Sequence, residues 1–111
     1  MKAYTDLNQS KKLAKILPLE SADMCWQQIY DENHMMSDYR VELIPYRLYS
    51  GIGLPCWSLA ALLDIYPMIV GRDMGMYCCW QNSKNLHSRH YDNPIDACVE
   101  MITRLHEQKL L

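Results

Sequence analysis

The sequence predicts an α+β fold, in which an antiparallel sheet of about four strands carries three helices packed on its faces, as in an α/β/α sandwich. Two observations lead to this expectation. Stretches with the two-residue period of a strand alternate along the chain with stretches of helical period. The strands are joined by short polar connections, and hairpins of this kind cannot make a parallel sheet. We expect one compact domain over residues 1–111.

The first helix is predicted to begin after Thr5 or Asp6, either of which can cap it. Gln9 stands at the third position after Asp6, where its side chain completes a capping box. Pro18 is expected to end the helix. This predicted helix has a narrow apolar stripe that consists of Leu13, Ile16 and Leu17.

Two strands are predicted next, in residues 24–30 and 39–46. Both "MCWQQIY" and "YRVELIPY" alternate between two faces with the period of a strand. The polar stretch "DENHMMSD" connects them, so we expect the two strands to pair in antiparallel fashion. Pro45 lacks a backbone donor and places its end of the second strand at a sheet edge or a bulge.

The apolar stretch "LPCWSLAALLD", residues 54–64, predicts a buried second helix with Cys56 in its first turn. Only Ser58 and Asp64 are polar between Cys56 and Tyr66, so this helix has almost no wet face. Pro67 disfavours helical geometry at the residue before it and ends the helix.

A hairpin and a final helix complete the predicted order. "VGRDMG" indicates a turn, "MYCCWQ" a strand, "NSKN" a loop and "LHSRHY" the return strand. Asn93 is the predicted cap of the last helix, Pro94 its first residue and Asp96 part of its first turn. Glu100 and Arg104 form an i,i+4 pair on its wet face. The apolar stripe of the last helix consists of Ile95, Cys98, Val99, Ile102 and Leu105.

Charge and composition exclude several classes of partner. Eleven Lys and Arg against thirteen Asp and Glu give a net charge of −2, with no long basic run, which argues against duplex DNA and anionic membranes. The longest apolar run, residues 54–70, is interrupted by Asp64 and Pro67 and is too short for a membrane span.

The cysteines and the first residues indicate a cytoplasmic protein. Five cysteines, an odd number without a CxxC pair, favour free thiols in a reducing compartment. The opening "MKAYTDLNQSKKLAKILP" lacks the apolar stretch of a signal peptide.

Tyr and Met each occur eight times and Phe is absent. This composition fits either half-buried strand faces with gap-filling methionine or a contact surface, because Tyr, Trp and Met are enriched in interface cores.

The second half of the chain resembles a known family. An apolar "WSLAALL", a strand with "YCCW" and then "NPIDACVEMITRLHE" resemble in order and pattern the phage ABA sandwich domain of small proteins from bacteria and their phages. The resemblance covers residues 54–108, and "NPIDAC" is its most specific part. It implies helices on both faces of an antiparallel sheet and a phage-derived or mobile-element setting, and it supplies no catalytic residues to transfer to this chain.

Cys56 is the candidate nucleophile of an alternative function, that of a cysteine hydrolase. A thiol in the first turn of a helix meets the positive end of the helix dipole, which favours the thiolate. His87 or His90 on the return strand would be its base. However, Pro55 precedes Cys56, and no third residue clearly orients either histidine. Because cysteine is among the most often buried residue types, a structural role is the favoured interpretation.

Two other kinds of site are weighed and disfavoured. Cys78, Cys79, His87 and His90 lie on one predicted hairpin, but neighbouring residues of a strand point to opposite faces, so the sequence predicts no metal site and no cofactor. Stacking of nucleic-acid bases on Trp80, Arg89 and Tyr91, with Lys84 in the loop, is disfavoured by the net charge.

The leading hypothesis is therefore a small cytoplasmic domain without catalysis that acts as an interaction or regulatory accessory. Its partner is expected to be another protein, bound through aromatic residues on a hairpin or a sheet edge. The candidate binding residues are Trp80, Arg89 and Tyr91.

Overall fold

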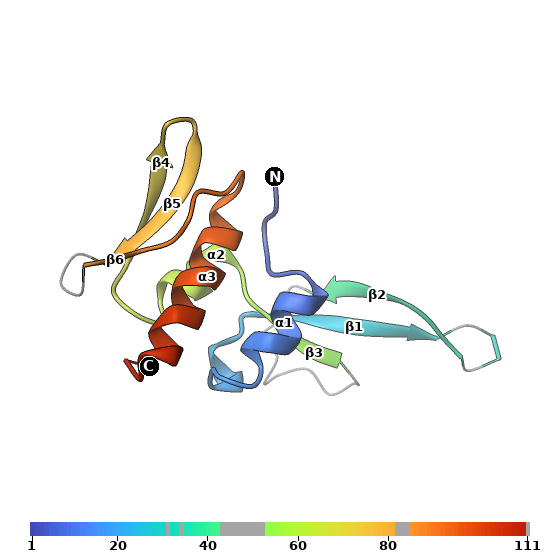
Figure 1. Ribbon diagram of the computed structural model, residues 1–111. Coiled ribbons are helices and arrows are strands. Elements are labelled where there is room, and N and C mark those ends of the chain that lie inside the picture. The colour runs from blue at the N-terminus through green and yellow to red at the C-terminus, as the bar shows by residue number, and fades with distance from the viewer. Residues whose placement is uncertain (31, 34, 43–52, 82–84, 111) are drawn as a thin grey trace. The chain divides into compact units, whose positions relative to one another are not determined.

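The computed structural model describes residues 1–30, 32–33, 35–42, 53–81 and 85–110 (Figure 1). It contains two compact units, one of residues 6–57 and one of residues 58–111 together with residues 1–5. We call them the 6–57 unit and the 58–111 unit. Each unit contains a three-stranded antiparallel sheet.

The 6–57 unit begins with the predicted helix and its capping box. The Asp6 carboxylate accepts a hydrogen bond from the Gln9 backbone at 2.8 Å, and the Gln9 side chain accepts one from the Asp6 backbone at 3.0 Å. The helix is shorter than its apolar stripe suggests, because regular α-helical structure ends at Leu13 and turns follow up to Pro18. The elements of this unit are α1 (Leu7–Leu13), a 3₁₀ turn (Leu19–Ser21), β1 (Met24–Tyr30), β2 (Met36–Glu42) and β3 (Gly53–Cys56).

The sheet of the 6–57 unit has the order β2-β1-β3. The two predicted strands and their antiparallel pairing are confirmed, with Trp26 opposite Val41. Strand β2 begins three residues earlier than predicted, and the end of the predicted strand, with Pro45, lies outside the described residues. On the other side of β1, Trp26 lies opposite Leu54 of β3.

The helix predicted to start at Cys56 is wrong in its beginning and its length. Met24 pairs with Cys56 and Cys25 with Pro55, so these residues end an edge strand, where proline is tolerated. Helix α2 (Leu59–Leu63) begins only after Ser58, whose hydroxyl accepts a hydrogen bond from the Ala61 backbone at 3.3 Å. The apolar run therefore divides into a strand that pairs with β1 and a short helix.

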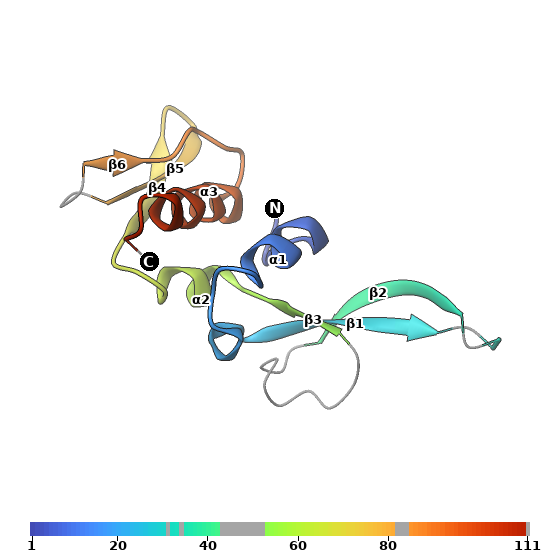
Figure 2. The same cartoon turned by 60° about the horizontal axis from the view of Figure 1, so that its bottom comes forward.

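The 58–111 unit places a long helix against a hairpin. In both views α3 runs beside β4 and β5, and α2 lies beside α3 (Figure 1, Figure 2). The sheet order is β4-β5-β6. After α2, the elements are β4 (Ile69–Asp73), β5 (Met76–Gln81), β6 (Leu86–His87) and α3 (Pro94–Glu107).

Strand β4 lies where the sequence predicts only a turn. The turn itself is Met74–Gly75, and both residues have positive φ, 54° and 82°, as a two-residue hairpin of type I′ requires. Gly71, which looked like part of a turn, lies within the strand. A Cβ atom on Gly71 would lie 3.0 Å from Cη2 of Trp80, so the glycine leaves room for the indole.

Helix α3 is confirmed together with its cap. The Asn93 side chain accepts a hydrogen bond from the Asp96 backbone at 2.9 Å, and Pro94 is the first helical residue. Among the described residues, the α+β class with three α-helices is thus confirmed. The described strands form two three-stranded sheets rather than one sheet of about four: residues 53–56 and 69–73 are strands that the sequence did not predict, and they pair with β1 and β5, respectively. The predicted apolar stripe of α3 is buried: Ile95, Cys98, Val99, Ile102 and Leu105.

Candidate functional site

Cys56 is the last residue of β3, and its side chain is 0% exposed. It does not lie in the first turn of α2, since that helix begins at Leu59 behind the Ser58 cap. The argument that a helix dipole favours the Cys56 thiolate therefore does not apply.

The two candidate base histidines are exposed residues of the 58–111 unit with hydrogen-bonding partners of their own. His90 Nε2 lies 3.0 Å from Asp73 Oδ2. This pair joins residues 88–91, which follow β6 and which we call the return segment, to the end of β4. Nδ1 of His87, on β6, lies 3.2 Å from the Ser88 carbonyl oxygen. The His90 imidazole thus links two segments of the hairpin, whereas the His87 contact is local.

Cys25, on β1, is a buried thiol of the 6–57 unit, and Cys78, Cys79 and Cys98 are buried thiols of the 58–111 unit. Cys78 Sγ lies 3.3 Å from the Ser88 carbonyl oxygen. Cys79 faces α3, where a hydrogen bond with the Cys98 side chain, together with burial, raises the pKa of the Cys79 thiol. Within the described ranges, no group of three or more His, Cys, Asp and Glu side chains could hold a metal ion.

These positions predict how the thiols react. We expect all five cysteines to resist alkylation by iodoacetamide in the native state and to react together when the chain unfolds, because a buried thiol is inaccessible to the reagent. Peptide mass spectrometry after timed labelling at several pH values measures this. Fast native labelling of Cys56 ahead of the other four would contradict the prediction and restore the hydrolase hypothesis.

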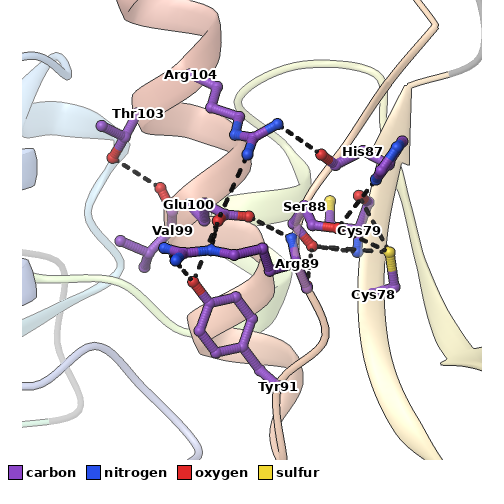
Figure 3. A network of polar contacts seen from close by, with 10 residues as sticks. All are labelled: Cys78, Cys79, His87, Ser88, Arg89, Tyr91, Val99, Glu100, Thr103 and Arg104. Atoms are coloured by element: carbon purple, nitrogen blue, oxygen red, sulfur yellow. Dashed lines mark hydrogen bonds and ion pairs between the residues drawn. The ribbon is translucent and has the colours of Figure 1, made fainter.

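Two of the three candidate binding residues belong to a polar network that fastens the return segment to α3 (Figure 3). The Glu100 carboxylate accepts hydrogen bonds from the Arg89 backbone at 2.6 Å, from Arg89 Nε at 2.7 Å and from the Tyr91 hydroxyl at 3.3 Å. Arg104 Nη2 lies 3.9 Å from the same carboxylate, and Arg104 Nη1 donates to the His87 carbonyl at 3.0 Å. The predicted i,i+4 pair is therefore present within a larger network.

The third candidate, Trp80, has a packing role. Its ring lies against Gly71 of the neighbouring strand and leaves the indole half-buried. Lys84, expected to accompany it, lies outside the described residues. The structure brings Arg89 and Tyr91 together on Glu100 and places Trp80 on the hairpin.

The network makes stability depend on pH. Partial burial acts to raise the pKa of Glu100, but hydrogen bonds from Arg89 and the charges of Arg104 and Arg89 outweigh it and lower that pKa. A carboxyl whose pKa is lowered by folding stabilises the native state above its unfolded pKa, and this contribution is lost as the pH falls through the native value.

We expect Glu100→Gln to lower the free energy of unfolding by roughly 1–2 kcal/mol near neutral pH, because the amide is a weaker acceptor than the carboxylate. The difference between wild type and variant should shrink on acidification below the ordinary glutamate range. Urea unfolding at about pH 7 and about pH 3 measures it. A difference independent of pH would contradict the assignment to the Glu100 charge.

Sequence reasoning missed the most exposed apolar residue of the hairpin. Met74 is 91% exposed at φ 54°, and Met76, two residues later, is 40% exposed. We call Met74, Gly75 and Met76 the hairpin tip. The count of eight methionines fitted either gap-filling core residues or a contact surface, because composition does not say which methionines are exposed.

Comparison with known protein families, with curated proteins and with solved structures finds no match for this chain. Within the described part of the chain, no helix is both long and apolar enough to cross a membrane.

Proposed function

We propose that this chain is a non-catalytic protein-interaction domain that presents its hairpin tip to a protein partner. The observation that carries the proposal is the 91% exposure of Met74. Burial of a methionine side chain by a partner contributes about 1.5–3 kcal/mol, and methionine adapts its shape to the surface it meets. In the isolated chain the exposed Met74 side chain does not gain this free energy of burial.

The backbone at Met74 supports the same proposal. In a type I′ turn the first central residue has positive φ, where Asn, Asp and Gly are favoured and a methionine is strained. Strained positions of this kind are enriched at functional sites. Arg72 and Asp73, both exposed, flank the tip, so an apolar centre has polar neighbours, as in many interfaces.

The remaining parts of the proposal rest on the sequence. The reducing cytoplasm follows from the cysteine count, and the phage or mobile-element setting follows from the resemblance of residues 54–108. The resemblance also implies sandwich packing of helices on both faces of a sheet.

Photo-crosslinking tests the proposal. Benzoylphenylalanine at position 74 is expected to give adducts with another polypeptide in a lysate of the source cells, and excess wild-type protein should suppress them. The same probe at Glu107, an exposed residue of α3, serves as the matched control. Equal adducts at both positions, or adducts that wild-type protein does not suppress, would refute an interaction through the hairpin tip.

Met74→Asn separates binding from folding. Asparagine suits the turn, so the variant should unfold at the same urea concentration as wild type or a higher one. As a competitor in the crosslinking assay it should be weaker than wild type by about tenfold or more, since the apolar contact is lost. Undiminished competition by this variant would exclude Met74 from the interface.

A further inference from the structure

We propose that Met74 and Met76 form an oxidation-sensitive pair whose conversion to methionine sulfoxide weakens binding of the partner by the hairpin tip. This inference rests on the proposed function of the tip. The two thioethers stand two residues apart on one hairpin, and they are 91% and 40% exposed. The methionines of the two cores, Met24 and Met101, are buried.

The chemistry needs a peroxide as the oxidant. A lone pair on the thioether sulfur attacks one oxygen of hydrogen peroxide, so that an S–O bond forms and the O–O bond breaks. The sulfur is oxidised by two electrons, the peroxide is reduced, and water leaves with its protons. In the reverse step two thiols reduce the sulfoxide, giving a disulfide, water and the original thioether.

The position of the pair lets oxidation alter the surface without unfolding the chain. Met74 faces water, and a Cβ atom on the adjacent Gly75 would meet no atom within 4 Å, so there is space around the tip. Met76 also faces outward: Cys79 faces α3, and side chains alternate along a strand, so Met76 lies on the opposite face of the sheet.

A sulfoxide at the tip therefore remains hydrated in the free protein. On binding, its oxygen would have to lose water without a matching donor, which disfavours the complex. Oxidation should consequently weaken the interaction and leave the fold unchanged.

The modification site is tested by timed exposure of the folded protein to hydrogen peroxide, followed by peptide mass spectrometry. Met74 and Met76 should each gain one oxygen at least about tenfold faster than Met24 and Met101, because peroxide reaches exposed sulfur first. Comparable rates at the exposed and buried methionines of the folded protein would overturn the assignment.

The switch is tested in the crosslinking assay with the protein probed at position 74. Oxidised wild type, used as the competitor, should need an at least about tenfold higher concentration than the unoxidised protein to suppress the adducts to the same extent. Treatment of the oxidised protein with methionine sulfoxide reductase and dithiothreitol should restore its competition. A Met74→Leu and Met76→Leu double variant should compete equally before and after peroxide, with an unchanged urea midpoint.

Met35→Leu is the matched control, because Met35 is exposed but lies outside the hairpin. This variant should still lose competition on oxidation. If oxidised wild type competes as well as unoxidised protein, or if Met35→Leu protects it, the switch is refuted while the proposed function stands. If unoxidised protein gives no specific adduct at position 74, the proposed function and the switch both fail, and the peroxide rates still decide whether the modification site exists.

Discussion

Trp57→Ala is expected to lower the free energy of unfolding by about 3–5 kcal/mol, the range found when a buried tryptophan is truncated. Trp57 is completely buried and is the largest fully buried side chain among the described residues. Its indole Nε1 also donates a hydrogen bond to Ser21 Oγ at 3.0 Å within the 6–57 unit. The variant loses both the apolar burial and this bond, and it leaves a cavity.

Urea unfolding followed by far-ultraviolet circular dichroism measures this loss. Trp57→Phe is the control, because it keeps most of the ring volume and removes the indole donor. Trp57→Phe should lower the free energy of unfolding clearly less than Trp57→Ala does. A loss below about 1 kcal/mol for Trp57→Ala would contradict a core role for the "PCW" segment and would reopen the question of an accessible site beside Cys56.

Ile102→Ala should lower the free energy of unfolding by about 2–5 kcal/mol, which is the second large effect that we expect. Ile102 is fully buried on the face of α3 that carries its apolar stripe, and α3 contacts both β5 and α2. Removal of the branched side chain leaves a cavity at this position. Because most of the stability of such a helix comes from the packing of its apolar face, the loss should extend over the 58–111 unit.

Glu107→Ala provides the comparison for Ile102. Glu107 belongs to the same helix but is exposed, so its replacement should change the free energy of unfolding by less than about 0.5 kcal/mol. The same urea titration measures both variants. Equal losses at the two positions would contradict the assignment of the Ile102→Ala loss to packing of the apolar stripe.

The candidate sites show the difference between residue type and residue environment. Cys56, Trp80 and Tyr91 all have side chains that occur in active sites or interfaces, and each was a reasonable candidate from its neighbours in the sequence. In the structure Cys56 ends a buried strand, Trp80 lies against Gly71, and Tyr91 donates a hydrogen bond to Glu100. Met74 had no sequence signal of its own, because its exposure depends on the hairpin that β4 forms with β5.

The sequence by itself determined the elements whose signals are local. Asp6 with Gln9 begins α1 and Asn93 with Pro94 begins α3, because a cap satisfies backbone donors that lie only two or three residues away. The alternation in residues 24–30 likewise determined β1, since a two-residue period can be recognised from consecutive residues alone.

Only the tertiary structure decided which secondary structure residues 53–56 and 69–73 adopt. Leu54 pairs with Trp26, 28 positions earlier in the chain, and this pairing outweighs the helical pattern of the apolar run around Cys56. Gly71 looks like a turn residue until Trp80 of the next strand lies against it. Strand pairing joins residues that are distant in sequence, so a local pattern cannot reveal it, whereas a helix closes its hydrogen bonds within four residues.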